Sequence, residues 1–335
     1  MDFFAAYDWM MKMMALPSAE RDAWRLKKLG DILEFAWLNV PFYREYWGDH
    51  GVAFTRPKDI EELSAFPILT KKIFRENSFQ IRPVNLKKIR HREWSTGGTT
   101  GAPVQYLRDL EQWTINEAFH LWGWCQIGYT FGDHVGVIAG GSLVPEKFNL
   151  ATYVRSSFHR RLFLYGVSMD EDLAKKYYRK LRNFDVKYLY GYPSILYLFG
   201  QQLKRMNLFL PNIRGIVTTA EMLLPHYREG LEENFNCRVY NNLGCNDGGF
   251  EAYECPRCGK LHYNYLQSIL ESEKLGKEKN ESLIITNLWN KSTPFIRYEN
   301  GDQISLSKKA SSCGCKYPVI DRIIGRTADI LKFTN

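Results

Sequence analysis

Residues 95–103 read STGGTTGAP, so glycines and hydroxyl side chains follow one another until a proline ends the run. Glycine lets backbone N–H groups approach a phosphate closely, and serine and threonine hydroxyls add neutral hydrogen-bond donors. A flexible linker can have the same composition, but this run lies between two strand-like segments, residues 89–94 and 104–107. We therefore predict a phosphate-binding loop. It is not of the Walker type, because no Gly-Lys-Ser/Thr sequence follows.

A second candidate for chemistry is a group of cysteines near the C-terminus. Cys255 and Cys258 are separated by two residues, His262 follows shortly after, and Cys313 and Cys315 form another close pair. Two such pairs can supply tetrahedral zinc coordination, with histidine as an alternative ligand. Incidental buried cysteines are the other interpretation. We predict a structural zinc site in a reducing, cytoplasmic compartment. Which four of the five residues bind zinc stays open, and we favour the four cysteines.

The overall composition limits the class of protein. The 335 residues are enough for two or three lobes, because single cores rarely grow beyond about 250–300 residues. No apolar run reaches the roughly 18 residues that span a bilayer, and the apolar N-terminal segment is interrupted by Asp2, Asp8 and Lys12. We therefore expect no signal peptide and no membrane insertion.

The net charge of +8 comes from scattered lysines and arginines. A solvated basic face explains it, and binding of small polyanions such as nucleotides is also compatible with it. A nucleic-acid-binding protein that uses the charge and a zinc knuckle is a rival class. However, the cysteine pairs lack the compact spacing of a zinc finger, and no basic-aromatic recognition segment is present. We expect no nucleic-acid partner.

The apolar patterning changes along the chain. Residues 1–90 show helical spacing, whereas short apolar runs then alternate with helical stretches, as at 134–141, 186–193 and 213–221. Strand and helix in alternation predict a layered α/β fold with parallel sheets flanked by helices, in which ligands bind at the loops after the strands. Beyond residue 260 turns are more frequent, which predicts a smaller, antiparallel, barrel-like lobe.

Several segments in a fixed order resemble one enzyme superfamily. The loop at 95–103 resembles the phosphate loop of adenylate-forming enzymes, the acyl-CoA synthetase superfamily. The other segments are similar to its phenylacetate–CoA ligase-like branch, which includes capsule-biosynthesis proteins. These segments are NVPFYREYW (Asn39–Trp47), FPILTKKIFREN (Phe66–Asn77), YGYPSIL (Tyr190–Leu196), TTAEML (Thr218–Leu223), PFIRYENGD (Pro294–Asp302) and GRTADIL (Gly325–Leu331).

The resemblance implies a reaction in two halves. A carboxylate attacks the α-phosphorus of ATP and gives an acyl-AMP and pyrophosphate, and a thiol, usually CoA, then displaces AMP. The first half requires positioning, donors for the phosphate charge and Mg²⁺. The expected ligands are therefore ATP, Mg²⁺, CoA and a small-molecule carboxylic acid. The loop residues expected to hold the β- and γ-phosphates are Ser95, Thr96, Gly97, Gly98, Thr99, Thr100 and Gly101.

The resemblance also assigns the other ligand contacts. Thr219, Ala220 and Glu221 would border the adenine. Asp302 would accept hydrogen bonds from both ribose hydroxyls, and Arg326 would contact the ribose or a phosphate. Aromatic side chains near the acid would favour an aryl or arylacetic acid. The residues of this expected acyl pocket are Trp124, Tyr190, Tyr192 and Gly244, with Trp122 as an alternative to Trp124.

The segment NNLGCNDGG departs from the family pattern. The family has an aromatic residue, a hydroxyl residue and a glutamate where this sequence has Leu243, Asn246 and Asp247. Asp247 can still bind Mg²⁺ and Asn246 can still donate to a phosphate oxygen, whereas Leu243 cannot stack on adenine. Asn246 and Asp247, with Thr99, are the expected catalytic residues. Leu243 and Gly244 are the expected nucleotide contacts in this segment.

The expected hinge also departs from the family. Ala328 stands where the family has the first of two acidic residues, and Asp329 remains. The family continues into a C-terminal lid domain of about one hundred residues, which supplies a lysine for adenylation. Because this sequence ends at Asn335, we expect that domain to be absent, adenylation by this chain alone to be weak, and thioester formation to be weaker still.

These interpretations predict an α/β protein whose function is ATP-dependent adenylation of a carboxylic acid, followed by thioester formation. The alternative is a catalytically weakened relative that binds nucleotide or acyl-adenylate in a polysaccharide or secondary-metabolite pathway. A homodimer is compatible with the sequence. The predicted regions are a helical part (1–90), an α/β part with the phosphate loop (91–210), an α/β and barrel-like part with the adenine, ribose and zinc sites (211–324), and the hinge (325–335).

Overall fold

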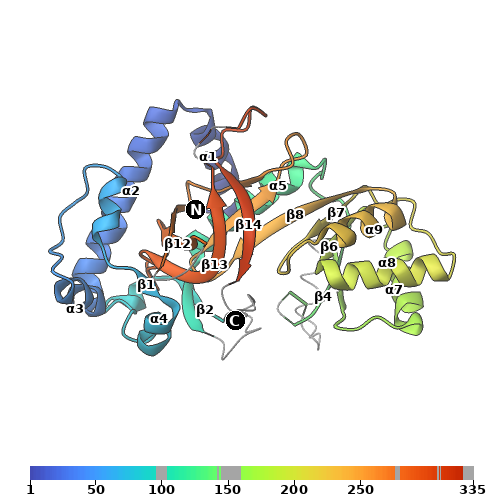
Figure 1. Cartoon of the computed structure of the whole chain (residues 1–335), viewed down its shortest axis with the longest axis horizontal. Helices are drawn as coiled ribbons and strands as arrows, with labels where there is room; N and C mark the ends of the chain where they lie inside the picture. Colours follow the sequence, from blue (N-terminus) through green and yellow to red (C-terminus); the bar gives the residue numbers. More distant parts are fainter. Residues whose placement is uncertain are drawn as a thin grey trace, which may run out of the picture. The chain divides into compact units, whose positions relative to one another are not determined.

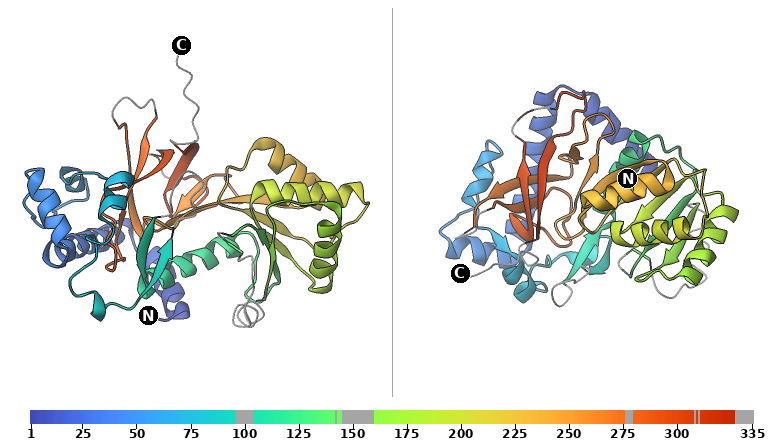
Figure 2. Two further views of the ribbon diagram at one scale, coloured as in Figure 1. Left: turned by 90° about the horizontal axis from the view of Figure 1, so that it is seen from below. Right: turned by 45° about the vertical axis from the view of Figure 1, so that its right-hand side comes forward.

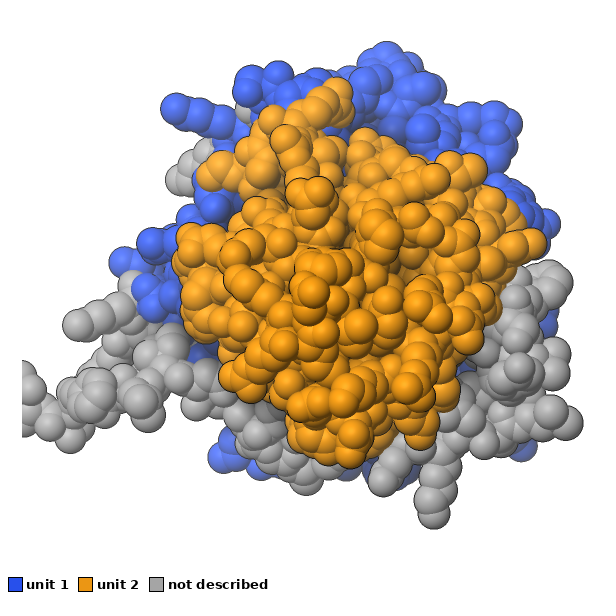
Figure 3. Space-filling view, turned by 90° about the vertical axis from the view of Figure 1, so that its right-hand side faces the viewer, with its two compact units in different colours: residues 1–122, 245–252, 262–335 blue, residues 123–244, 253–261 orange. Residues whose placement is uncertain are grey.

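The chain forms two compact units (Figure 3). Unit 1 comprises residues 1–122, 245–252 and 262–335, and unit 2 comprises residues 123–244 and 253–261. The four sequential regions expected from the sequence are a different division and stay a prediction. The computed structural model describes residues 1–95, 104–141, 143–144, 160–275, 280–307, 309 and 311–326.

Unit 1 begins with helices whose first turns are stabilised by capping residues. The Asp2 carboxylate accepts a hydrogen bond from the backbone N–H of Ala5 at 2.9 Å, and the Thr70 hydroxyl accepts one from that of Ile73 at 3.3 Å. Each satisfies an N–H group that has no partner within its helix. The helices are α1 (Phe3–Ala15), α2 (Ser18–Asn39), α3 (Pro41–Asp49) and α4 (Lys71–Asn77), with 3₁₀ turns η1 (Glu61–Ala65) and η2 (Leu86–Lys88).

An aromatic core joins these helices to the C-terminal part of the same unit. Trp47, Phe66 and Phe74 belong to one buried cluster with Phe295 and Tyr298. The rings of Phe74 and Phe295 are stacked with their centroids 5.0 Å apart. Figure 2 shows the blue N-terminal helices beside the orange-to-red strands that contribute to this core. Within the described residues, no helix is both long enough and apolar enough to cross a membrane.

The C-terminal strands of unit 1 form an antiparallel sheet. Strands β11 to β14 pair in sequence order, and Asp302 of β13 lies opposite Arg326 of β14. A two-residue strand, β1, pairs in parallel with β13, so that Leu69 lies opposite Tyr298. The antiparallel lobe predicted beyond residue 260 is confirmed. The strand bounds are β1 (Leu69–Thr70), β11 (Ser268–Glu273), β12 (Ser282–Asn287), β13 (Tyr298–Leu306) and β14 (Val319–Arg326).

A separate hairpin of unit 1 carries the predicted phosphate loop. Strands β2 (His91–Ser95) and β3 (Gln105–Asp109) are antiparallel, and Ser95 lies opposite Gln105. These strands agree with the strand-like segments expected on both sides of the loop. Residues 96–103 lie outside the described residues, so the loop assignment stays a prediction. Helix α5 (Leu110–Gln126) follows the hairpin directly.

Unit 2 contains the parallel sheet that the sequence predicted. Its strand order is β5-β4-β6-β7-β8, and helices α7, α8 and α9 connect β5 to β8 along the chain and flank the sheet (Figure 1). Ile138, Leu189 and Ile216 pack against Phe199 of α8 in its core. A Cβ at Gly191 would lie 1.9 Å from the carbonyl oxygen of Ile138, so the approach of β6 to β4 requires glycine. The element bounds are β4 (Val135–Ala139), β5 (Arg161–Tyr165), α7 (Glu171–Asn183), β6 (Tyr188–Gly191), α8 (Pro193–Arg205), β7 (Gly215–Thr218), α9 (Pro225–Phe235) and β8 (Arg238–Cys245), followed by β9 (Phe250–Glu254) and β10 (Leu261–Tyr263).

Candidate active site

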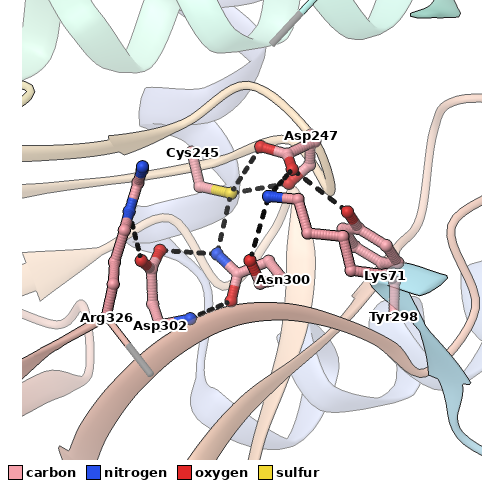
Figure 4. A network of polar contacts seen from close by, with 7 residues as sticks. All are labelled: Lys71, Cys245, Asp247, Tyr298, Asn300, Asp302 and Arg326. Atoms are coloured by element: carbon pink, nitrogen blue, oxygen red, sulfur yellow. Dashed lines mark hydrogen bonds and ion pairs between the residues drawn. The ribbon is translucent and has the colours of Figure 1, made fainter. Parts of the chain in front are cut away.

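A network of polar side chains surrounds Asp247 in unit 1 (Figure 4). Nζ of Lys71 lies 3.3 Å from Oδ2 of Asp247, and the Tyr298 hydroxyl donates to the same oxygen at 3.1 Å. The Lys71 ammonium also donates to the backbone carbonyl of Asn300 at 3.3 Å. The Cys245 thiol donates to the backbone carbonyl of Asp247 at 2.6 Å. The carboxylate expected to bind Mg²⁺ is therefore held by an ammonium and a phenol.

The backbone around Asp247 depends on two glycines. Asp247 lies in the turn between β8 and β9, and Gly248 and Gly249 follow with φ angles of +97° and +69°. This left-handed region favours glycine. A Cβ at Gly248 would lie 2.7 Å from the side chain of Ile285, and one at Gly249 would lie 2.6 Å from the amide of Asn287. Both positions therefore require glycine for conformation and for space.

Strand β1 brings Lys71 to the network. Lys71 is the first residue of α4 and directly follows β1, in which Thr70 lies opposite Glu299 of β13. Residues 298–300 of β13 supply the phenol and the carbonyl that Lys71 and Asp247 contact. A two-residue pairing between distant parts of the sequence thus determines which cation faces Asp247.

A second carboxylate, that of Asp302, lies at the other end of the network. The Asn300 amide donates to Oδ2 of Asp302 at 2.5 Å and to the sulfur of Cys245 at 3.2 Å. Nε of Arg326 donates to Oδ1 of Asp302 at 3.0 Å across the β13–β14 pairing. Asn300 therefore connects the surroundings of Asp247 to those of Asp302. The network contains two carboxylates and two cations.

Burial keeps two groups of this network protonated, the Cys245 thiol and the Tyr298 hydroxyl. Burial raises the pKa of the Cys245 thiol well above its ordinary value, and the carboxylates of Asp247 and Asp302 reinforce the shift. The pKa of Tyr298 is also raised well above its ordinary value, chiefly by burial and then by Asp247. Both groups therefore stay protonated and act as hydrogen-bond donors. Burial likewise raises the pKa of Asp302, although Arg326 opposes the shift.

A buried arginine contacts Asn246, the residue before Asp247. Nη1 of Arg108 donates to Oδ1 of Asn246 at 3.4 Å, and its Nε donates to Oε1 of Gln112 at 2.7 Å. The guanidinium carbon lies 5.4 Å from the centroid of the Trp94 ring. Strand β3 thus places a cation beside one of the expected catalytic residues.

The expected adenine contacts lie in unit 2, directly after β7. Thr219 is buried, and its N–H donates to the carbonyl of Gly191 at 3.0 Å. Ala220 has a φ angle of +68°, which is unusual for a residue with a Cβ. The exposed carboxylate of Glu221 accepts a hydrogen bond from the N–H of Ser194 at 3.3 Å, in the first turn of α8. The segment therefore forms a constrained turn at the carboxyl end of a parallel strand.

The expected acyl-pocket residues also belong largely to unit 2. Trp124 and Tyr190 pack edge to face with ring centroids 5.7 Å apart, and the Tyr190 hydroxyl donates to Oδ1 of Asn242 at 3.3 Å. Tyr192 is the residue before α8. The alternative tryptophan, Trp122, lies in unit 1, where it packs against Phe119 and Tyr317. Leu243 and Gly244 lie near the end of β8.

The structure thus brings Asn246, Asp247, Asp302 and Arg326 into one unit. Ser95 ends β2, whereas the other expected phosphate-loop residues, Thr96–Gly101, and the hinge beyond Arg326 lie outside the described residues. The expectations for those segments stay predictions. Sequence reasoning did not identify Lys71, Cys245, Tyr298, Asn300 and Arg108. Lys71, Tyr298 and Asn300 lie within FPILTKKIFREN and PFIRYENGD, the segments that carry the family resemblance, so a signal for them was present.

A candidate metal centre includes four of the five expected ligands. The ligand atoms of Cys255, Cys258, His262 and Cys313 all lie within 4.8 Å of one another. Nδ1 of His262 lies 2.6 Å from the carbonyl oxygen of Tyr317, which requires Nδ1 to donate and leaves Nε2 as the acceptor. Nε2 lies 3.5 Å from the sulfur of Cys313. This group differs from the four-cysteine set that we favoured, because His262 stands in the place of Cys315.

Comparisons with known proteins agree with the motifs. No family model matches the chain. The chain is 26% identical over 278 residues to Protein CapK of Staphylococcus aureus, and the match covers 82% of this chain but only 61% of that protein. It is 21% identical to the phenylacetate-coenzyme A ligase of Thermus thermophilus, with 96% of this chain and 73% of that protein covered.

A solved structure shares the fold. The crystal structure of 2-hydroxyisobutyryl-CoA ligase in the postadenylation state matches with a TM-score of 0.74 at 20% identity, over 96% of this chain and 71% of that one. The layered α/β fold expected from the sequence is therefore confirmed. The chain is thus similar in sequence to Protein CapK and to phenylacetate-coenzyme A ligase and similar in fold to 2-hydroxyisobutyryl-CoA ligase, which agrees with its resemblance to the phenylacetate–CoA ligase-like branch of the adenylate-forming enzymes.

Proposed function

We propose that this chain binds ATP and a carboxylic acid and joins them as an acyl-adenylate, from which a thiol such as CoA takes the acyl group in the full-length protein. The observation that carries the proposal is the network of Figure 4. It connects the two carboxylates expected at the nucleotide, Asp247 and Asp302, through Asn300 and Cys245 within one unit. The named ligases among the relatives support the same chemistry.

In the first half-reaction, an oxygen of the acid attacks the α-phosphorus, and the bond from that phosphorus to the oxygen bridging to the β-phosphorus breaks. Pyrophosphate leaves with the electron pair. Asp302 would accept hydrogen bonds from the ribose hydroxyls, with Arg326 holding its second oxygen in place. Asn246 would donate to a phosphate oxygen, as would Thr99 and the rest of the loop from Ser95 to Gly101. Thr219–Glu221 would border the adenine.

The residues around Asp247 fit a magnesium ion. Oδ2 of Asp247 accepts from Lys71 and Tyr298, whereas among the described residues Oδ1 meets only the thiol of Cys245, at 3.5 Å. Mg²⁺ commonly binds one or two carboxylates together with phosphate oxygens and water. When bound, it would neutralise the charge that develops on the phosphates. Oδ1 of Asp247 would hold it, and Lys71 would add a second positive charge nearby.

An aryl or arylacetic acid is the proposed substrate class. Trp124, Tyr190 and Tyr192 would form the walls of its pocket, because aromatic side chains provide flat, apolar surfaces that match a ring. The edge-to-face contact of Trp124 with Tyr190 supports this assignment. The cytoplasmic location, in which the thiols remain reduced, and the homodimer are parts of the same proposal.

Nucleotide binding tests the proposal. Calorimetric titration of the 335-residue chain with ATP-Mg and AMP should show saturable binding that tightens with one member of a panel of carboxylic acids. Asp302→Asn should weaken AMP binding by about tenfold or more, because hydrogen bonds to a charged acceptor are lost. The matched control is Asp321→Asn, an exposed carboxylate of β14. Equal AMP affinity of Asp302→Asn and wild type would contradict the ribose assignment.

A weakened relative that binds acyl-adenylate without turnover is the second candidate. The Lys71 ammonium already neutralises Asp247, which favours a site that binds without recruiting metal. Leu243 and Ala328, which stand where the family pattern has an aromatic and an acidic residue, also favour a weakened relative. Exchange of labelled pyrophosphate into ATP separates the two candidates, because exchange requires formation of the acyl-adenylate and binding does not.

We also propose that Cys255, Cys258, His262 and Cys313 bind a structural zinc ion. Their chemistry fits: three thiolates and one imidazole are typical of closed zinc sites, and the Tyr317 carbonyl orients the imidazole. Elemental analysis should find one zinc per chain. His262→Ala should lose it, and Cys315→Ser, the matched control, should retain it. Loss from Cys315→Ser with retention by His262→Ala would restore the four-cysteine set.

A further inference from the structure

Strand β3 buries two polar side chains that have unused hydrogen-bonding capacity. Arg108 is 4% exposed, and its Nη2 has no hydrogen-bond partner within the described residues. Tyr106, two positions earlier, is 2% exposed, and its hydroxyl likewise has no partner there. Residues two apart on a strand point to the same face. One face of β3 therefore presents two unused donors.

No carboxylate of residues 1–95, 104–141 or 160–275, nor of the later described residues, balances the charge of Arg108. Its contacts are the side-chain oxygens of Gln112 and Asn246 and the face of the Trp94 ring, all of which are uncharged. No carboxylate of the described residues lies within ion-pair distance of it. A guanidinium cannot release its proton to avoid this cost, and buried charges are ordinarily paired. Within the part of the chain that the structure describes, Arg108 is therefore a buried cation without a paired anion.

Asp109 is the carboxylate nearest to Arg108 in the sequence, but it binds backbone groups instead of the guanidinium. The oxygens of Asp109 accept hydrogen bonds from the backbone N–H groups of Lys291 and Ser292, each at 2.8 Å. Asp109 thus anchors β3 to the segment after β12. It does not compensate Arg108.

The unused donors lie next to the network of Figure 4. Arg108 contacts Asn246, which precedes Asp247. Burial raises the pKa of Tyr106 well above its ordinary value, Arg108 opposes the shift and Asp247 adds to it, so the Tyr106 hydroxyl lies near both of these charged groups. An anion bound here would meet the guanidinium, the phenol and the expected catalytic amide together.

We infer that Arg108 and Tyr106 form a subsite for an oxyanion of the reactants, either the carboxylate of the acid or a phosphate of the nucleotide. The inference deepens the proposed function and rests on it for the identity of the reactants. A planar guanidinium with a free nitrogen can bind such an oxyanion through charge-assisted hydrogen bonds, and the Tyr106 hydroxyl adds a neutral one. A bound anion would supply the negative charge that balances the buried guanidinium.

The test measures binding of three simple anions to the 335-residue chain by calorimetry: phenylacetate, inorganic pyrophosphate and AMP. Arg108→Gln should weaken the anion that uses the subsite by about 10- to 100-fold, because a charged hydrogen bond is lost. Tyr106→Phe should weaken the same anion by about 3- to 10-fold. Arg108→Lys, which keeps the charge, should recover part of the affinity. If the variants lose affinity for phenylacetate alone, the subsite binds the carboxylate of the acid. If they lose affinity for AMP or pyrophosphate, it binds a phosphate of the nucleotide.

The matched control is Arg92→Gln. Arg92 lies opposite Arg108 in the β2–β3 hairpin but is exposed, so the control removes the same charge from the same hairpin. Its anion affinities should stay within about twofold of wild type, as expected for screened surface charge.

Two results would overturn the subsite: equal affinities of wild type and Arg108→Gln for all three anions, or a wild-type chain that binds none of them at millimolar concentration. Failure of the proposed function gives a different pattern. A chain without pyrophosphate exchange whose anion binding still depends on Arg108 would keep the subsite and lose the adenylation chemistry. Circular dichroism of each variant confirms that it is folded before binding is compared.

Discussion

Two arginines of unit 1 are equally buried and differently surrounded. Arg108 and Arg297 are each 4% exposed. Arg297 forms ion pairs with Glu271 and Glu273, and its Nη1 donates to the backbone carbonyls of Ser64 and Phe66 at 2.9 and 2.7 Å. Among the described residues, the partners of Arg108 are all neutral. Burial alone therefore does not distinguish a structural cation from a ligand-binding one, whereas the charge of the partners does.

The largest expected effect is on the free energy of unfolding when each of the two arginines is replaced in turn. Arg297→Met should lower the free energy of unfolding by about 3–5 kcal/mol, because it leaves Glu271 and Glu273 without their cation. Arg108→Met should change that free energy by less than about 1 kcal/mol or increase it, because no carboxylate loses a partner. Urea unfolding of both variants checks this. A large loss of stability in Arg108→Met would show instead that Arg108 is a structural cation like Arg297.

A third cation of unit 1 is intermediate between these two arginines. Lys71 pairs with Asp247, but its side chain is 33% exposed, so water screens part of the interaction. Lys71→Met should therefore lower the free energy of unfolding by about 1–2 kcal/mol, less than Arg297→Met. The variant should also need less Mg²⁺ for half-maximal ATP binding, because the ammonium no longer competes at Asp247. Lys72→Met, at the exposed neighbouring position, is the control for stability.

The smallest effect concerns the pH dependence of stability at Asp302. Burial raises the pKa of its carboxyl above the ordinary value of 3.8. Its contribution to stability is therefore fully present below the unfolded-state pKa and is lost as the pH rises through the higher folded-state pKa. Wild type should gain stability relative to Asp302→Asn as the pH falls through that window. Melting temperatures of both proteins measured across the acidic range check this, and parallel curves would contradict the raised pKa.

The sequence predicted those parts of the molecule that depend on local pattern. The parallel sheet of unit 2 was predictable because apolar runs such as 134–141 end in glycine or proline and alternate with helical stretches. Asp302 was predictable from the segment PFIRYENGD, and the structure holds it between Asn300 and Arg326.

Other features depend on contacts that the sequence does not display. Lys71 reaches Asp247 only because two residues of β1 pair with β13, and a strand of that length leaves no periodic pattern. Cys245 lies in the segment NNLGCNDGG but was not among the expected site residues, yet its buried thiol connects Asn300 to the backbone of Asp247. His262 joins the group in place of Cys315 because the fold brings its imidazole within 4.8 Å of the other three ligand atoms, which spacing cannot reveal.

The pairing of β1 with β13 has a consequence for how the protein is made. Lys71 and Asp247 are 176 residues apart in the sequence, and the backbone N–H of Leu69 bonds to the carbonyl of Arg297 at 2.9 Å. On the ribosome, the N-terminal helices leave the exit tunnel long before their partners in β13 are synthesised. Contacts of such long range form slowly, and apolar surface that waits for them is prone to aggregation. The network around Asp247 therefore assembles late in synthesis, and the apolar face of the early helices waits for its partner in β13.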